Sequence, residues 1–220
     1  MIEIRWDWIY SHLDDVAEKT WQHIQLLVIP LVLGFAIAFL LAILAYHRRS
    51  AIGPITAVTG LLYTIPALAA FAVLRPVFGL ELPTAVIPLT TYTLLILFVN
   101  TLAGLRSVPP DVEEAARAMG YSSWSRLLRI RLPLALPLIM AGVRVAAVTT
   151  IGLVTVASII GGDRFGGLGQ FITEGLDTRF DTKIYLGAVG SVILAFVVDA
   201  LLVGMQRLLT PWTRVRAAEG

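Results

Sequence analysis

Long stretches without Asp, Glu, Lys or Arg are the feature that most restricts how this chain can fold. The first three such runs occupy residues 20–47, 50–74 and 82–105, with 28, 25 and 24 residues. A helix needs about 20 apolar residues to cross the hydrocarbon core of a bilayer, so each run is long enough. Only 15% of the residues are charged, against about 25% in an ordinary soluble domain. The composition therefore argues against a soluble globular enzyme.

Two further crossings are expected in the second half of the chain. The fourth is centred in residues 135–160 and is expected to bend or break near Pro137 and Gly152, because both residues weaken a helix. The fifth is expected at 184–209; it contains Asp199 and ends before Pro211. The sequence thus predicts an all-α membrane protein with five transmembrane helices.

Arginine is distributed unequally between the loops that these helices create. Five crossings place ten arginines on one side of the membrane and six cations on the other. The positive-inside rule puts the ten-arginine side in the cytoplasm, the N-terminus outside and the C-terminus inside. We expect an extracytoplasmic segment at 1–23, a transmembrane domain at 24–209 and a cytoplasmic tail at 210–220. An interfacial aromatic belt is expected from Trp6, Trp8, Tyr10 and Trp21.

Several other classes of function find no support in the sequence. The net charge is +2 and the chain contains no cysteine, which argues against a basic nucleic-acid-binding face and excludes a thiolate metal site within the chain. His12, His23 and His47 are too scattered to suggest a metal site. The glycine-rich segment 161–169 lacks the Gly-Lys-Ser/Thr ending of a phosphate-binding loop. We therefore expect no catalytic residues and no cofactor in this chain.

The connection between the third and fourth crossings, residues 106–131, is the one long loop on the expected cytoplasmic side. Its sequence is RSVPPDVEEAARAMGYSSWSRLLRIR. Asp111 is expected to cap a helix that Gly120 ends, and Ser122 or Ser123 to cap a second helix at 124–130. A protruding helix of this kind either docks in the groove of a partner protein or rests on lipid headgroups. Its physical properties are compatible with both interpretations.

The same loop carries a family resemblance. Glu114-Ala115-Ala116 is followed, at fixed spacing, by Gly120, Ile130 and Leu132-Pro133. This pattern resembles the EAA signature of permease subunits in bacterial ABC importers. The resemblance implies that the first helix is a coupling helix, which lies in a cleft of a cytoplasmic ATPase subunit. The residues expected to contribute to this coupling are Asp111, Glu113, Glu114, Ala115, Ala116, Met119 and Gly120.

Other segments narrow the resemblance to one subfamily. The segments Thr64–Pro66, Asn100-Thr101, Ala141–Arg144 and Gly161–Gly169 resemble permeases for glycine betaine, choline and carnitine. The resemblance implies a type I importer with five helices in each permease subunit. It also implies partners: a second permease subunit, identical or paralogous, two ATPase subunits that hold ATP and Mg, and an external substrate-binding protein or domain.

Two charged residues lie well inside the expected transmembrane helices, Arg144 in the fourth and Asp199 in the fifth. They lie about 16 Å and about 12 Å from the expected cytoplasmic helix ends at 1.5 Å per residue, so we expect an ion pair between them. The pair is expected to act as a static clamp or as part of a translocation pathway or gate. Thr64, Pro66 and Asn100 are the other pathway candidates, although Asn100 is better explained as a helix cap.

The expected function is that of a permease subunit of an ATP-driven osmoprotectant importer in the bacterial cytoplasmic (inner) membrane. A permease for methionine, ergothioneine or another small zwitterion is an alternative of the same class. A secondary transporter or channel without an ATPase is an alternative of another class. Such a protein normally shows repeated halves, and five crossings do not divide into two.

Overall fold

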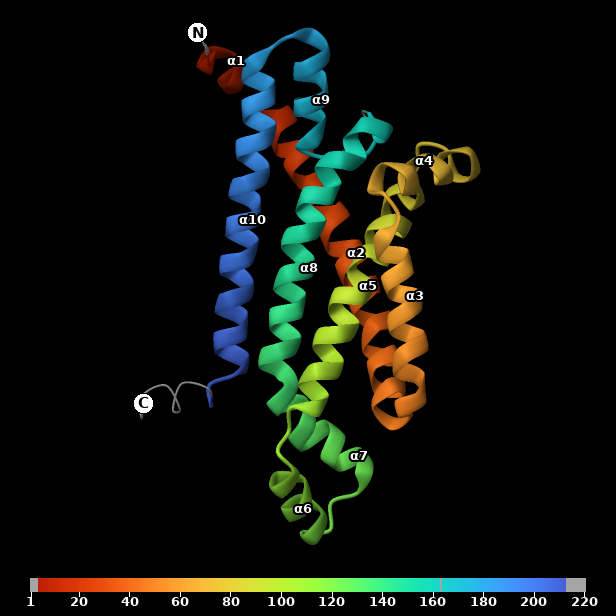
Figure 1. The fold of residues 1–220 in the computed structure, drawn as a ribbon. Helices are drawn as coiled ribbons and strands as arrows, with labels where there is room; N and C mark the ends of the chain where they lie inside the picture. Colours follow the sequence, from red (N-terminus) through yellow and green to blue (C-terminus); the bar gives the residue numbers. More distant parts are fainter. Residues whose placement is uncertain (1–3, 163, 213–220) are drawn as a thin grey trace.

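The computed structural model describes residues 4–162 and 164–212, in which every regular element is helical. Figure 1 shows an elongated bundle with α1, α4 and α9 at one end and α6 and α7 at the other. We call these the α9 end and the α6 end. The main helices of the bundle are α2 (Leu13–His47), α3 (Ile52–Thr64), α5 (Leu82–Arg106), α8 (Leu132–Gly161) and α10 (Asp181–Leu209). The shorter helices are α1 (Trp6–Ser11), α4 (Ala67–Phe78), α6 (Pro110–Ala118), α7 (Ser123–Arg126) and α9 (Gly169–Thr178).

Four helical segments are long and apolar enough to cross a membrane by themselves. They are Leu13–His47, Leu82–Arg106, Ser123–Gly161 and Asp181–Leu209. These segments contain the first, third, fourth and fifth expected crossings, so the all-α membrane fold is confirmed. With the α3–α4 pair, the described residues hold four or up to five candidate spans.

The second expected crossing is not one helix. The helical segments Arg49–Thr64 and Ala67–Phe78 meet at an angle of 87°. Pro66 lacks an N–H group and forces the preceding residue out of the helical conformation, and Ile65 accordingly has φ −61° and ψ 128°. The Tyr92 hydroxyl of α5 donates a hydrogen bond to the Ile65 carbonyl that the break leaves free. With 13 residues, α3 is about 20 Å long, which is shorter than a hydrocarbon core of about 30 Å.

The break that the sequence suggested in the fourth crossing is absent. Helix α8 runs without interruption from Leu132 to Gly161, with Pro137 and Gly152 inside it. Pro137 removes one hydrogen bond, to the carbonyl of residue 133, and the helix continues on both sides of it. Gly152 weakens a helix but does not end one when its neighbours continue the hydrogen-bond ladder.

The centre of the bundle is formed by α2, α5 and α8, and small residues set the distances between these helices. Ala38, Ala42 and Ala45 of α2 are fully buried in the main apolar cluster. A Cβ added at Gly104 would lie 2.8 Å from the Ala135 carbonyl oxygen, and one at Gly142 would lie 2.5 Å from Asn100 Cβ. Because lipid provides little hydrophobic force between helices, close packing of this kind holds a membrane bundle together.

Helix α10 lies at the edge of the bundle, beside α8 and α9 (Figure 1). Within its most apolar stretch only 11% of the residues are buried, and exposed side chains include Val192, Phe196 and Leu201.

At the α9 end, Trp8 stacks on His12 and meets Phe171 and Phe180 edge-on. Trp6, Tyr10 and Trp21 are exposed, as expected for interfacial aromatic residues.

Candidate functional site

The projecting element at the α6 end begins with two prolines and ends at a glycine. Pro109 is the N-cap residue of α6 and Pro110 its first residue. Asp111 therefore lies in the first turn, where it suits the helix dipole, and the expectation that it caps the helix is wrong. Gly120 has φ +81°, a left-handed conformation that favours glycine, and it ends the element as expected.

The second half of this element is continuous with the membrane. Ser122 Oγ accepts a hydrogen bond of 3.2 Å from the Ser125 N–H, so Ser122 is the cap of α7. A π-helical turn, Leu127–Arg131, then joins α7 to α8 without a gap. The separate helix expected at 124–130 is thus the first part of the long segment Ser123–Gly161.

Glu113 points toward its own chain and clamps α6 to this continuous segment. Its Oε1 lies 2.8 Å from Arg126 Nε and 2.6 Å from Arg131 Nη2. Arg131 Nε donates a further hydrogen bond of 2.7 Å to Glu113 Oε2. All three side chains are only 15% exposed. We call this set, Glu113 with Arg126 and Arg131, the loop clamp.

The loop clamp also reaches the end of α2. The Arg131 guanidinium carbon lies 4.3 Å from the centroid of the Tyr46 ring, a cation–π contact. One glutamate therefore links α6 to α7 and to the π-helical turn and, through Arg131, to α2. Sequence reasoning placed Glu113 beside Glu114 in the coupling set and assigned nothing to Arg126, Arg131 or Tyr46, because ion pairs between distant residues leave no local pattern.

The remaining residues of the expected coupling set divide between two faces of α6. Ala116 is 1% exposed and packs inward, so it is not part of an exposed surface. Glu114 and Ala115 are exposed, and Met119 is 68% exposed. Asp111, Glu114 and Ala115 are thus exposed on α6, as is its C-cap residue Met119, and we call these four residues the outer face of α6.

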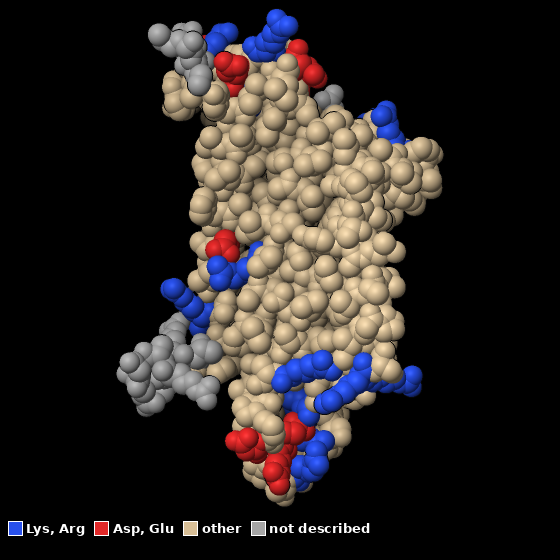
Figure 2. All heavy atoms as spheres, in the orientation of Figure 1, with Lys and Arg blue, Asp and Glu red and all other residues tan. Residues whose placement is uncertain are grey.

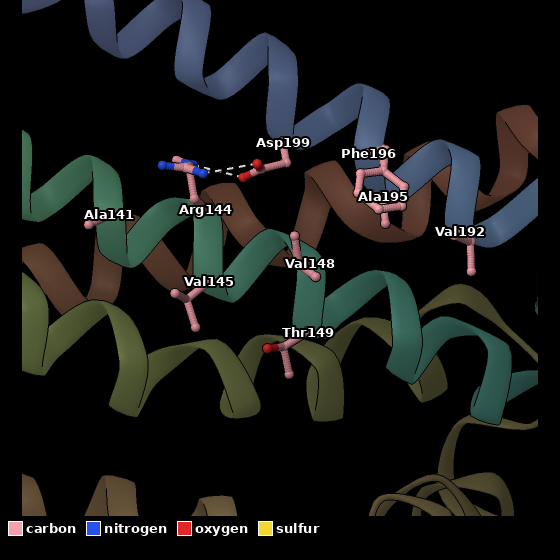
Figure 3. A pocket seen from close by; sticks show the side chains of 9 residues that line it. All are labelled: Ala141, Arg144, Val145, Val148, Thr149, Val192, Ala195, Phe196 and Asp199. Carbon is pink, nitrogen blue, oxygen red and sulfur yellow. Dashed lines mark hydrogen bonds and ion pairs between the residues drawn. The ribbon is translucent and has the colours of Figure 1, made fainter.

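The ion pair expected inside the membrane is present. Arg144 Nε lies 2.7 Å from Asp199 Oδ1, and Arg144 Nη2 lies 2.9 Å from Asp199 Oδ2. Both residues line a groove between α8 and α10 that has a volume of about 640 Å³. Figure 3 shows the two side chains pointing toward each other, with Phe196 on the same helix as Asp199. The expected ion pair between the fourth and fifth crossings is confirmed.

The other pathway candidates do not meet at this pair. Thr64 and Pro66 lie at the α3–α4 break, across the bundle from α10 (Figure 1). Asn100 Nδ2 donates a 2.8 Å hydrogen bond to the Ile96 carbonyl within α5 and packs against Gly142 of α8. Because α5 ends at Arg106, Asn100 does not cap it, and that expectation is wrong.

A buried histidine at the α9 end escaped sequence reasoning. His23 of α2 is fully buried, with Nε2 3.2 Å from the Ile151 carbonyl oxygen and Nδ1 accepting from the Leu168 N–H at 3.3 Å. Gly167 has φ +51°, and a Cβ added there would lie 2.6 Å from His23 Cβ. His23 therefore holds the glycine-rich turn against α2. Within the described residues, no three His, Asp or Glu side chains form a group suited to a metal ion.

The fold matches that of a known class of transport protein. A chain of the MetNI methionine ABC transporter, solved in inward-facing conformations, superposes with a TM-score of 0.75 at 22% sequence identity. The match covers 89% of this chain and 96% of that chain. This chain therefore shares its fold with a chain of an ABC transporter.

The sequence comparisons give the family. Residues 22–215 match the family described as binding-protein-dependent transport system inner membrane component, and the chain belongs to this family. The choline transport system permease protein OpuBB of Bacillus subtilis is 35% identical over 90% of this chain and 89% of that protein. The osmoprotectant import permease protein OsmW of Salmonella typhimurium is 34% identical over 93% and 98%.

A third relative is the carnitine transport permease protein OpuCD of Listeria monocytogenes, which is 34% identical over 93% of this chain and 91% of that protein. The chain is thus a multi-pass inner-membrane permease subunit of an ABC importer, related to osmoprotectant permeases. It is a transport component and not an enzyme. This result sets aside the alternative of a secondary transporter or channel.

Proposed function

We propose that this permease imports osmoprotectants such as glycine betaine, choline or carnitine, and that α6 couples it to a separate ATPase subunit. The outer face of α6 carries this proposal, because Glu114, Ala115 and Met119 are exposed on a helix that projects beyond the bundle. Small and flexible side chains let a partner approach closely. Glu113 and Ala116 have a supporting role, since they fix the helix from its inner side.

The complete importer is proposed to contain this permease, a second permease subunit that is identical or paralogous to it, and two ATPase subunits that bind ATP and Mg. The family description supports an external binding protein as a further partner. The break at Thr64 and Pro66 and the close contact of Asn100 with α8 are proposed to serve the movement between inward-facing and outward-facing states.

The α6 end is proposed to be cytoplasmic. The loops that the structure gathers at this end contain most of the arginines, and Figure 2 shows charged side chains gathered at the two ends of the molecule. The positive-inside rule favours the arginine-rich end for the cytoplasm. The ranges 1–23, 24–209 and 210–220 then correspond to an outer segment, the transmembrane domain and an inner tail; residues 1–3 and 213–220 lie outside the described part of the chain.

Single cysteines test this orientation, because the natural chain has none. Ser50 is exposed in the turn between α2 and α3 at the α6 end, and Thr178 is exposed at the end of α9. A membrane-impermeant maleimide is expected to label Thr178→Cys in intact cells and Ser50→Cys only after the membrane is opened. The reverse pattern would place the α6 end outside and would also remove the proposed contact with an ATPase.

Uptake by cells tests the substrate. In a strain without other osmoprotectant importers, the complete importer is expected to support ATP-dependent uptake of labelled glycine betaine, carnitine or choline, and to raise growth at high salt. The alternative is import of methionine or another small zwitterion. The match to MetNI does not favour this alternative, because at 22% identity it shows only a shared fold. Methionine uptake without osmoprotectant uptake would replace the proposed substrate and leave the coupling proposal intact.

A further inference from the structure

The Arg144–Asp199 pair lies well inside helices α8 and α10. Arg144 is about 18 Å along α8 from Leu132, and Asp199 is about 15 Å along α10 from Leu209, at 1.5 Å per residue. The hydrocarbon core is about 30 Å thick, so neither charge reaches the headgroups at the helix ends. Figure 2 shows that the middle of the molecule is otherwise nearly uncharged on the visible face.

The pair is not sealed inside the bundle. The Arg144 and Asp199 side chains are 35% and 33% exposed, and they open into the groove between α8 and α10. Exposed charges at this depth are costly against lipid chains, and charged residues inside membranes almost always face a water-filled cavity or a polar partner. We therefore expect the groove to face water or a polar ligand in the assembled importer.

The chemistry of the groove is complementary to a zwitterion. The two Arg144 nitrogen atoms that now hold Asp199 present the planar pair of donors that a free carboxylate accepts. Asp199 offers a negative charge to a cation. Phe196 lies on the same face of α10, almost one turn before Asp199, and its 72% exposed ring suits a quaternary ammonium group. The other lining residues are small or apolar: Ala141, Val145, Val148, Thr149, Val192 and Ala195.

We propose that this groove is a weak binding site of the permease for a zwitterion that carries a carboxylate and a quaternary ammonium group. In the empty site, the Arg144 guanidinium and the Asp199 carboxylate bind each other through two charged hydrogen bonds. A zwitterion gives each of them a new partner, its carboxylate on Arg144 and its ammonium group between Asp199 and Phe196. A ligand with only a positive charge would take Asp199 and leave Arg144 unpaired, which is unfavourable at this depth.

This inference rests on the proposed function, since it names the place where the proposed substrate class would bind. It adds a selection rule: the permease itself prefers zwitterions over simple cations. The competing explanation is that the pair is a static clamp between α8 and α10, with no contact to substrate. The two explanations differ in what happens when the charges are exchanged between the helices.

Binding to the purified permease–ATPase complex, without its binding protein, tests the site with glycine betaine and choline as probes. The wild-type complex is expected to bind glycine betaine weakly and choline at least about tenfold more weakly. Arg144→Gln is expected to weaken glycine betaine binding about tenfold and to remove most of this preference. Phe196→Leu should weaken binding of both probes, and Phe196→Tyr should preserve it because the aromatic ring remains.

The exchanged variant, Arg144→Asp with Asp199→Arg, separates a site from a clamp. It restores an ion pair but places the positive charge beside Phe196, so glycine betaine binding is expected to stay lost while the complex still assembles. Recovery of binding and transport in this variant would show a clamp. Failure of the wild-type complex to bind glycine betaine, or equal binding by Arg144→Gln, would also overturn the site; osmoprotectant uptake by the wild-type importer would then still support the proposed function.

Discussion

Replacing Ala115 with glutamate is expected to abolish import and to release the ATPase subunit from the permease. Ala115 is exposed on the outer face of α6, where a small side chain permits close approach of a partner. Glutamate is a good helix former, so α6 should persist. The added bulk and charge at the centre of a close-packed contact are expected to weaken ATPase association about 100-fold or more, as at an interface hot spot.

Co-purification of the ATPase chain and uptake of labelled substrate measure this effect. Ala72→Glu is the matched control, because Ala72 is also an exposed helical alanine but lies on α4, at the opposite end of the bundle. The control is expected to retain the ATPase. If Ala115→Glu retained both the ATPase and normal uptake, α6 would not be the docking element.

Replacing Glu113 with glutamine is expected to uncouple ATP hydrolysis from transport. Glutamine keeps the shape of the side chain but removes the charge that holds Arg126 and Arg131 together. Hydrogen bonds to charged groups contribute about 1.5–3 kcal/mol each, and two arginines left without a carboxylate repel each other. Because α6 is then no longer fixed to α7 and to the π-helical turn that leads into α8, we expect transport per ATP hydrolysed to fall about tenfold.

Glu114→Gln provides the comparison, since it makes the same substitution on the next residue of the same helix. Glu114 is exposed on the outer face of α6, so its replacement is expected to weaken ATPase association without changing the transport achieved per ATP by the complexes that remain. ATPase assays and uptake in proteoliposomes distinguish the two effects. An unchanged coupling ratio in Glu113→Gln would show that the loop clamp does not transmit motion.

The parts of the fold that the sequence predicted are those that depend on local composition. The uncharged run at 82–105 predicted α5, which spans Leu82–Arg106, and Asp199 between apolar residues marked the inside of α10. Pro66 is visible in the sequence inside the second uncharged run, but the angle of 87° between the two helical segments depends on what the chain packs against. Pro137 is a similar signal that produced no break, because the helix continues on both sides of it.

The candidate site divides in the same way. Residue spacing placed Glu114, Ala115 and Gly120 in the projecting loop, but Glu113 and Ala116 turned out to face inward. A helix of nine residues shows the same sequence pattern whichever side faces the bundle. The face of α6 that turns toward the bundle is set by Arg126 and Arg131. These two residues follow the turn at Gly120, and both bind Glu113.

The uncharged runs by themselves determined that this chain crosses a membrane as helices, because a buried charge in lipid is costly whatever the tertiary arrangement. The depth of Arg144 and Asp199 along their helices determined that they could pair. Only the tertiary structure decided that the pair is one-third exposed in a groove beside Phe196, and that Glu113 joins α6 to α7, to the π-helical turn and, through Arg131, to α2. The physical reason is that burial and partner choice depend on which helix faces meet, and this follows from the close packing of the whole bundle.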